Sequence, residues 1–158
     1  MSINKVREYL KLHGVDDKRI IEFDTSSATV ALAAKALGCQ EAEIAKSISF
    51  DLDGRSILVV AAGDVKIDNR KYKDRFGAKA KMLSHEEAVI RIGHAVGGVC
   101  PFAVNEGVEV YLDESLKRFE VVYPAAGSSN SAICMNLSEL ESLSCALGWV
   151  DVCKSIDI

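Results

Sequence analysis

The stretch IGHAVGGVCPFAV, residues 92–104, concentrates residue types that could do chemistry. Cys100 follows His94, and a nearby base or cation is what lowers the pKa of a cysteine nucleophile. No acidic residue is evident to orient that histidine, and Val99 and Pro101 flank the thiol with apolar surface. We therefore favour Cys100 as a small buried residue on a tight loop over Cys100 as a catalytic thiol.

The glycines of the same stretch indicate a second kind of chemistry. Gly97 and Gly98, followed by Cys-Pro, let the backbone approach a ligand closely and aim several N–H groups at one point. Such groups suit a phosphate or the oxyanion of an acyl-transfer transition state. The spacing is neither G-x-G-x-x-G nor G-x-x-x-x-G-K-[ST], which argues against nucleotide binding of those kinds. A ligand-facing loop and a structural turn are equal alternatives on this evidence.

Two further stretches could contribute to a binding site. Lys46 begins a predicted strand whose inward positions should be apolar, so its ammonium must either reach solvent or hold an anion. Residues 125–132, AAGSSNSA, offer backbone and hydroxyl donors for a ribose or an amino acid, although a plain turn has the same composition. His13 and His85 are expected at helix ends, in capping or surface roles. No His, Cys and carboxylate cluster has metal-ligand spacing, so we expect no metal and no other cofactor.

Composition restricts the class of protein. The chain has 158 residues, 49% of them hydrophobic and 27% charged, which fits a single globular domain over residues 1–158. Its longest apolar runs are too short to span a bilayer, and its N-terminus lacks the apolar core of a signal peptide. We therefore expect a cytoplasmic protein without membrane contact. Five cysteines without a C-x-x-C pair argue against a disulfide framework and a zinc knuckle.

Basic residues gather in one segment of an acidic chain. The net charge is −4, yet seven basic residues stand against two aspartates between Lys66 and Lys81. A local basic patch suits phosphate binding, because acidic residues elsewhere suppress indiscriminate binding. Lys66, Arg70, Lys71 and Lys73 are therefore candidate nucleic-acid contacts, although charge alone favours an ordinary solvated helix face.

The predicted elements place these residues around a sheet. We expect helices over residues 2–13, 28–37, 41–45, 69–76, 85–92 and 137–147. Ser2 should cap the first of these helices, and the last should bury Leu147. We expect strands over 19–23, 45–52, 55–62, 64–68, 80–83, 108–113, 119–126 and 131–136, with a type I′ turn at Asp53-Gly54. The apolar strand 55–62 should be central and covered on both faces. This order is not a strict β-α-β alternation, so we expect a mixed α/β fold with a barrel-like mixed β-sheet flanked by helices.

Four stretches, taken in order, resemble a known family. SATVALAAKALG, EIAKSISF, GHAVGGVCPF and GSSNSAICMNLSEL are similar to segments of the YbaK/ProX family of aminoacyl-tRNA editing domains, and the resemblance covers nearly the whole chain. It implies a free-standing, trans-acting deacylase of mischarged tRNA, with cysteinyl- or alanyl-tRNA(Pro) as the expected substrate. It implies mischarged tRNA and not DNA as a partner. It leaves open whether the protein docks on prolyl-tRNA synthetase and whether it is a monomer or a homodimer.

The same resemblance assigns roles to residues. The family lysine corresponds to Lys46 and the glycine loop to residues 93–102, so we expect Lys46, Gly97 and Gly98 to be catalytic. The loop amides would bind the developing oxyanion, and Lys46 would position the 3′ end of the tRNA. The expected substrate contacts are His94, Val99, Cys100, Pro101, Phe102, Gly127, Ser128 and Ser129, and the expected acceptor-stem contacts are Lys66, Arg70, Lys71 and Lys73. Many relatives have serine in place of Cys100 and glycine in place of Ala103, which leaves the amino acid that is removed open.

Two other functions are kept as alternatives. A non-catalytic module would bind an amino acid or charged tRNA without turnover, for use by a regulator. A thiol-based redox enzyme would use Cys100 and would require a low thiol pKa at that residue.

Overall fold

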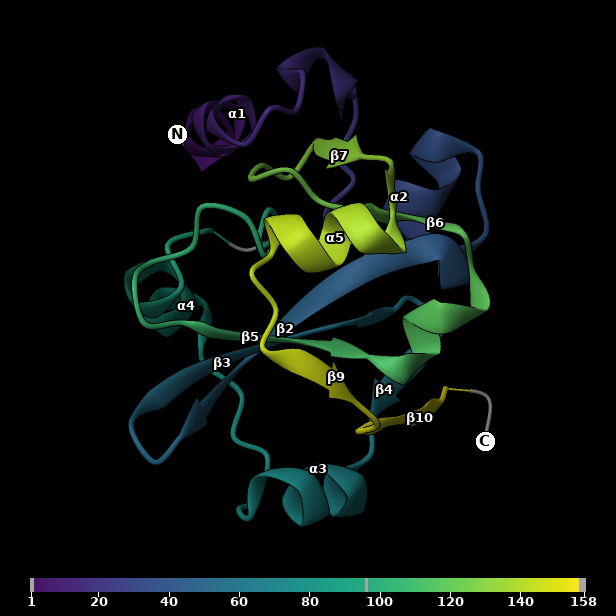
Figure 1. Cartoon of the computed structure of the whole chain (residues 1–158). Helices are drawn as coiled ribbons and strands as arrows, with labels where there is room; N and C mark the ends of the chain where they lie inside the picture. The colour runs from purple at the N-terminus through teal and green to yellow at the C-terminus, as the bar shows by residue number, and fades with distance from the viewer. Residues whose placement is uncertain (1, 96, 157–158) are drawn as a thin grey trace.

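The computed structural model describes residues 2–95 and 97–156 and is built around a six-stranded mixed sheet that curls into a half-barrel (Figure 1). Its strands lie in the order β8-β6-β2-β3-β5-β9. Their bounds are β2 Ile44–Leu52, β3 Arg55–Ala62, β5 Glu109–Asp113, β6 Val121–Pro124, β8 Met135–Asn136 and β9 Gly148–Val150. β2 pairs antiparallel with β3 but parallel with β6, so the predicted mixed α/β fold is confirmed.

Short ribbons and helices surround this sheet. β1 (Ile20–Glu22) pairs antiparallel with β7 (Ser131–Ile133), and β4 (Val65–Ile67) pairs antiparallel with β10 (Cys153–Ser155). The helices are α1 Ser2–Leu12, α2 Val30–Leu37, α3 Asn69–Phe76, α4 His85–Arg91 and α5 Leu137–Leu143. In Figure 1, α3 lies below the sheet, whereas α1 and α5 lie above it. No helix in the described part of the chain is long and apolar enough to cross a membrane.

The core lies on both faces of the central strand β3. Every residue from Ile57 to Ala62 is fully buried, which confirms the predicted central, doubly covered strand. On the face toward α3, the rings of Phe50 and Tyr72 lie 4.8 Å apart and those of Tyr72 and Phe76 lie 4.7 Å apart. Because both faces are packed, β2 and β3 form a rigid platform for residues at the adjoining edge.

Local sequence signals place the ends of several elements. Asp53 and Gly54 adopt φ of 51° and 87°, as the predicted type I′ turn between β2 and β3 requires. The Ser84 hydroxyl accepts a hydrogen bond from the Glu87 N–H while the Glu87 carboxylate accepts one from the Ser84 N–H. This confirms the predicted capping box of α4.

Several predicted elements differ from the structure. Residues 80–83 form no strand, only a bridge between Phe50 and Met82, and residues 41–45 contain a 3₁₀ turn at Glu41–Glu43. Ser2 is the first helical residue of α1 and not its cap. The final helix ends at Leu143, because the chain reverses at Cys145 (φ 52°) and the Leu147 N–H donates to the Val110 carbonyl. The prediction that Leu147 is buried is wrong, since its side chain is 63% exposed.

Candidate active site

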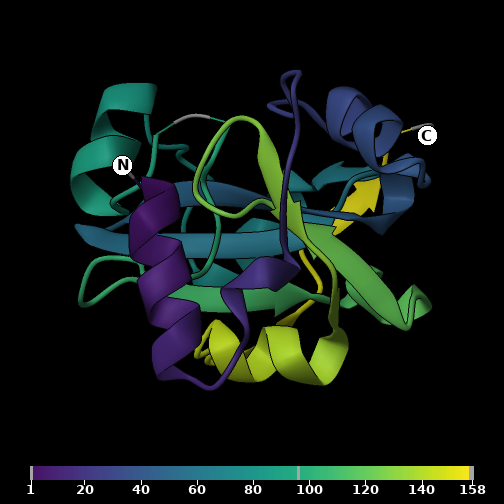
Figure 2. The same ribbon diagram turned by 90° about the horizontal axis from the view of Figure 1, so that it is seen from above.

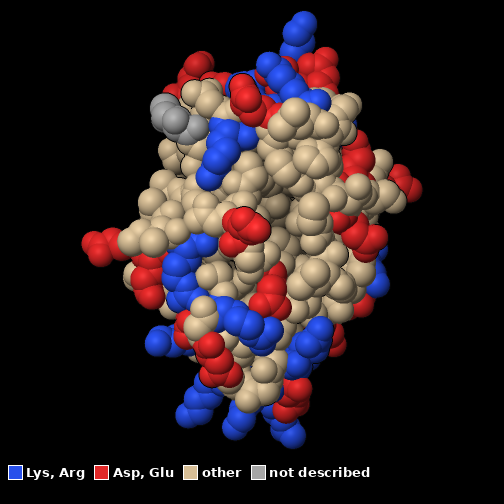
Figure 3. Space-filling view, turned by 60° about the vertical axis from the view of Figure 1, so that its left-hand side comes forward, with Lys and Arg blue, Asp and Glu red and all other residues tan. Residues whose placement is uncertain are grey.

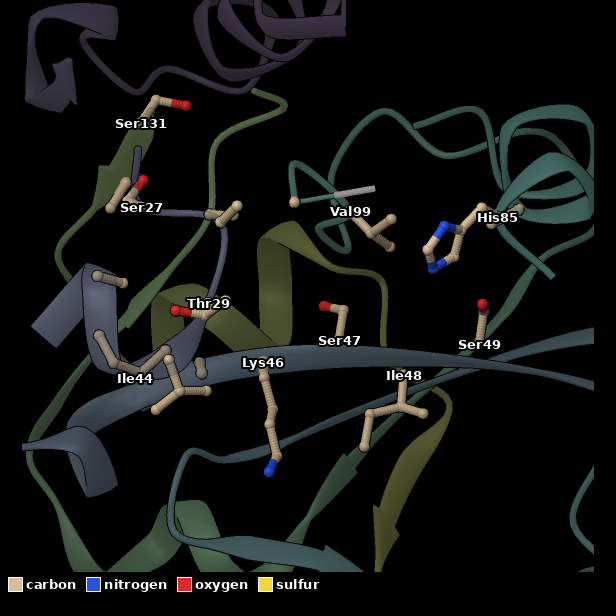
Figure 4. A pocket seen from close by; sticks show the side chains of 18 of the residues that line it. Ser27, Thr29, Ile44, Lys46, Ser47, Ile48, Ser49, His85, Val99 and Ser131 are labelled. Carbon is tan, nitrogen blue, oxygen red and sulfur yellow. The ribbon is translucent and has the colours of Figure 1, made fainter. Parts of the chain in front are cut away.

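A cavity of about 250 Å³ opens at the edge of β2 (Figure 4). Residues 46–49 of β2 form its floor, and three groups of residues form its walls. The first precedes and begins α2, the second comes from α4 and the glycine loop, and the third follows β6 and enters β7. These wall residues include Ser27, Ala28, Thr29, Val30, Met82, Leu83, Ser84, His85, Gly97, Val99, Tyr123, Ala125, Ser131 and Ala132.

The cavity lies where β2 changes its pairing partner. The register of β2 with β6 covers only Ile44 and Ala45, whereas Ser49 accepts a hydrogen bond from the Leu83 N–H at 3.0 Å. Between these contacts β6 and the segment before α4 diverge, which leaves room beside residues 46–48. The interrupted sheet edge therefore creates the site, and the side chains of β2 alternate between its two faces.

Two loops that lie far apart in the sequence meet at the cavity. A Cβ atom on Gly98 would lie 2.7 Å from the backbone nitrogen of Ser128 and 2.8 Å from the carbonyl carbon of Gly127. A Cβ atom on Gly97, which adopts φ of 83°, would lie 2.9 Å from the Ala28 side chain and 3.2 Å from that of Ser129. Only glycine permits such close backbone approach. The structure thus brings the predicted residues Gly97 and Gly98 together with Gly127, Ser128 and Ser129.

Hydrogen bonds fix the same loops to the segment before α2. The Ser27 N–H donates to the Ser129 carbonyl at 2.7 Å, and the Ser128 hydroxyl lies 2.6 Å from that of Ser131. Seen from above, the loop after β6 and the segment leading into α2 run side by side over the sheet (Figure 2). Three strand-free segments therefore hold one another in place around the opening of the cavity.

The loop amides differ in their availability. The Gly98 N–H closes a turn by donating to the Ala95 carbonyl at 3.0 Å. Gly97 and Val99 both line the cavity, and no acceptor among the described residues is hydrogen-bonded to either N–H. Among the described loop residues, these two combine a place in the cavity wall with an uncommitted N–H, while Gly98 contributes close packing. Residue 96 of the same loop lies outside the described residues.

Lys46 does not face the glycine loop. In Figure 4 its side chain and that of Ile48 point to one side of β2, whereas Ser47 and Ser49 point to the side of Val99. The Lys46 ammonium donates to the carbonyls of Gly63, at 3.4 Å, and of Val65. Burial lowers the pKa of Lys46. No carboxylate of the described chain forms a salt bridge with it; two backbone carbonyls accept its hydrogen bonds, and the more distant Asp64 carboxylate adds a favourable charge interaction.

The hydroxyl groups on the floor of the cavity were not predicted from the sequence. Ser47 and Ser49 occupy alternate positions of β2, and both side chains lie on the cavity side of the strand (Figure 4). The period-two alternation that starts at Lys46 was the signal that could have found them, because it puts both serines on the opposite face from the lysine. His85 is exposed at the start of α4, in agreement with the expected position at a helix end, and its ring also points into the cavity beside Ser49. No aspartate or glutamate is among the described lining residues; most of the lining is apolar, and its polar groups are chiefly hydroxyls and backbone amides.

Four other residues of the glycine loop lie behind it, in the core. His94, Cys100 and Phe102 are completely buried, and none of them lines the cavity as described. His94 Nε2 donates to the Phe102 carbonyl at 2.7 Å, and burial lowers the pKa of this histidine. Pro101 lines a separate hollow beside Tyr9. These residues hold the shape of the loop, while Gly97 and Val99 face the cavity.

The environment of Cys100 argues against a thiol nucleophile. Its Sγ lies 3.7 Å from His94 Nε2, but that nitrogen already donates to a carbonyl. Burial raises the pKa of the thiol to about 12, so the reactive thiolate is not populated near neutral pH. The thiol-based redox alternative lacks the low pKa it requires.

We accordingly expect Cys100 to react slowly with alkylating agents in the folded protein. Cys145, which is exposed, should be modified first, and Cys100 only when the protein opens. Mass spectrometry of protein treated with iodoacetamide for increasing times would measure both rates. Cys100 labelling as fast as Cys145 would contradict this assignment, and denatured protein, in which both should react alike, is the control.

The predicted nucleic-acid contacts lie on the far side of the sheet from the loops. Lys66 is on β4, and Arg70, Lys71 and Lys73 are on α3, at the lower end of the molecule where Figure 3 shows Lys and Arg side chains gathered. The Lys71 ammonium is held by the Asp151 carboxylate at 3.0 Å and the Cys153 carbonyl at 2.9 Å. Residues 77–83 lead from α3 back to the cavity, which Met82 and Leu83 line. This segment connects the basic helix with the site.

The site is a small, mostly apolar cavity on a curled mixed sheet, with a few hydroxyls and backbone amides in its lining, which suits a small ligand that has both apolar and polar parts. The sequence model of the aminoacyl-tRNA editing domain matches residues 24–143, which include most of the residues that line the cavity. The chain belongs to the aminoacyl-tRNA editing domain family, as its resemblance to the YbaK/ProX group predicted.

Comparisons with individual proteins support this family membership. The chain is 50% identical over 155 residues to YwhH, an uncharacterized protein of Bacillus subtilis strain 168, and covers 98% of both chains. It is 34% identical over 110 residues to the proline–tRNA ligase of Halalkalibacterium halodurans. The aligned residues make up 68% of this chain but only 19% of the ligase. A solved structure described as a candidate trans-editing enzyme for prolyl-tRNA synthetase matches with a TM-score of 0.87 and 27% identity, over 98% of each chain.

Proposed function

We propose that this protein is a trans-acting deacylase that hydrolyses the ester bond of mischarged tRNA, with cysteinyl- or alanyl-tRNA(Pro) as its substrate. The observation that carries this proposal is the pair of available amides, Gly97 and Val99, on the wall of a cavity that is large enough for a small aminoacyl group. Family membership and the likeness to the trans-editing structure support the same reaction. The nucleotide at the 3′ end of the tRNA would lie at the opening of the cavity.

The proposed chemistry needs no side-chain nucleophile. Water attacks the ester carbonyl carbon, the carbonyl oxygen becomes an oxyanion, and the bond to the ribose oxygen then breaks as that oxygen takes up a proton. The amides of Gly97 and Val99 would stabilise the oxyanion, and losing one such donor costs on the order of 10²–10³ in rate in other enzymes. Cys100, which is buried behind the loop, would take no part in the reaction.

An enzyme of this kind meets an energetic need. A synthetase pocket rejects a side chain that is smaller by one methylene by only ~1–3 kcal/mol, so misacylated products form at appreciable rates. A second site that admits only small aminoacyl groups removes them. The small side chains around the cavity, such as Ala28, Ala125 and Ala132, give it the size that such a second sieve requires.

Deacylation of a panel of tRNA(Pro) charged with alanine, cysteine, serine or proline tests the proposal. We expect the protein to release the amino acid from at least one mischarged species and to spare prolyl-tRNA(Pro). Release would be measured with radiolabelled amino acid at catalytic protein concentration. Binding of charged tRNA without release of any amino acid would contradict the proposal and favour the non-catalytic binding module.

The basic helix is proposed as a contact for the tRNA acceptor stem. Replacing Lys73 by alanine should weaken tRNA binding and reduce the slope of log K against log salt by about 0.9, the value for one lost phosphate contact. Lys71→Ala should have a smaller effect, because Asp151 and Cys153 already hold its ammonium. Filter binding at several salt concentrations would measure the slopes. Lys18→Ala, an exposed lysine of the 3₁₀ turn Asp17–Arg19 and not of α3, is the control. An unchanged slope for Lys73→Ala would show that α3 is an ordinary solvated helix face.

A further inference from the structure

The hydroxyl of Ser47 is a buried polar group without a partner. Its Oγ atom is shut off from solvent, and no hydrogen-bond partner for it exists among the described residues. Other parts of Ser47 line the cavity, since the residue as a whole is only half-buried. Buried hydroxyls are normally hydrogen-bonded, and those that are not call for a specific explanation.

The surroundings of Ser47 indicate where its partner would come from. Ser47 points from the floor toward Val99, across the cavity from the loop amides (Figure 4). A serine hydroxyl changes direction by rotating about the Cα–Cβ bond between staggered positions, and one such rotation can turn Oγ into the open space. The missing partner would then be an atom of a ligand inside the cavity.

The geometry of an aminoacyl ester determines which ligand atom this is. If the ester carbonyl lies at the Gly97 and Val99 amides, the first side-chain atom beyond Cβ lies only three bonds from the carbonyl carbon. A short side chain can then reach the floor opposite Val99. The α-amino group can instead face the hydroxyls of Ser27, Thr29 and Ser131, which line the other end of the cavity in Figure 4.

We propose that Ser47 selects aminoacyl groups that carry a hydroxyl or thiol on the β-carbon, so that cysteinyl and seryl esters are hydrolysed faster than alanyl esters. A serine or cysteine side chain supplies an atom that both donates to and accepts from the Ser47 hydroxyl. Alanine supplies only a methyl group and leaves the hydroxyl unpaired. This inference rests on the proposed deacylase function and names the substrate class of the same site.

The test compares kcat/KM for cysteinyl-, seryl- and alanyl-tRNA(Pro) between the wild type and Ser47→Ala. We expect the wild type to prefer the first two, and Ser47→Ala to reduce that preference roughly tenfold, the usual size of one hydrogen bond, with little change toward alanyl-tRNA. Because the change removes an unpaired buried hydroxyl, Tm should stay the same or rise. Ser47→Thr, which keeps a hydroxyl, should retain the preference better than Ser47→Val, which has the same shape without one. Ser142→Ala, on the exposed face of α5, is the control.

Each other outcome overturns the inference in a distinct way. An equal loss toward all three substrates would place the Ser47 contact on a part that they share, such as the α-amino group. A wild-type preference for alanyl-tRNA that Ser47→Ala leaves unchanged would show that the hydroxyl does not select. If the wild type hydrolyses no mischarged tRNA at all, the proposed function fails and this inference fails with it.

Discussion

Replacing Gly98 by alanine is expected to lower deacylation about 100-fold. The new Cβ atom would lie 2.7 Å from the Ser128 nitrogen and 2.8 Å from the Gly127 carbonyl carbon. Both are backbone atoms and cannot rotate away, so the two loops must separate. A shift of about 1 Å in a group that positions a substrate can cost 10²-fold in rate, and Gly97 and Val99 are the direct neighbours of the altered residue.

The same substitution should also cost stability, by about 1–3 kcal/mol, which is typical of overpacking. Steady-state deacylation and thermal unfolding would measure the two effects separately. Gly148→Ala is a matched control, because Gly148 does not adopt positive φ and an added Cβ would have no atom within 4 Å. Full activity of Gly98→Ala would show that the close contact between the loops is not needed for catalysis.

Replacing Lys46 by methionine is expected to lower kcat/KM for mischarged tRNA by two orders of magnitude or more. Methionine keeps much of the aliphatic stem but removes a half-buried ammonium that forms no salt bridge in the described part of the chain. The proposed role of that charge is to position the 3′ end of the tRNA. In the structure the ammonium lies on the carbonyls of Gly63 and Val65, on the other side of β2 from Ser47. To reach the tRNA it would turn around the edge of β2, which has no neighbouring strand at residues 46–48.

Stability measurements separate this role from a structural one. If Lys46 acts on the tRNA, Lys46→Met should keep a Tm within a few degrees of the wild type, and Lys46→Arg should recover part of the activity. The alternative is that Lys46 holds the turn at Gly63. This turn is tightly packed, because a Cβ atom on Gly63 would lie only 2.0 Å from the Glu41 carbonyl oxygen and 2.7 Å from Val30 in the cavity wall. In that case the loss of activity would accompany a clear fall in Tm. Undiminished activity would exclude both roles.

The sheet could be predicted from the sequence because its signals are local. The apolar run of β3 and the Asp53-Gly54 turn act over a few residues, and the structure has both as expected. The end of the last helix could not be predicted, because Leu147 leaves it to pair with Val110 far earlier in the chain. Long-range pairing of this kind overrides a helical pattern that is otherwise continuous.

The candidate site was predictable only in part, for a similar reason. Gly97 and Gly98 stand out by residue type, and so does the small-residue loop 125–132. The structure shows that the two loops touch, at residues 127–129, which neither sequence pattern indicates by itself. The serines of the floor do not stand out, because alternate serines are unremarkable until the strand they occupy is known to border a cavity. His85 lies at a helix start, as expected, but only the fold shows that its ring points into that cavity.

The N-terminal helix α1 touches both loops of the site, although it precedes the family match, which begins at residue 24. The Lys5 ammonium donates to the Gly93 carbonyl at 2.8 Å, and a Cβ on Gly127 would lie 2.8 Å from the Ser2 carbonyl oxygen. A bulky fusion at this end would therefore press on the loops of the candidate site, whereas the C-terminal strand β10 pairs with β4, on the other side of the sheet. An attachment beyond β10 would therefore spare the two loops, but it would adjoin β4, whose Val65 carbonyl accepts a hydrogen bond from Lys46.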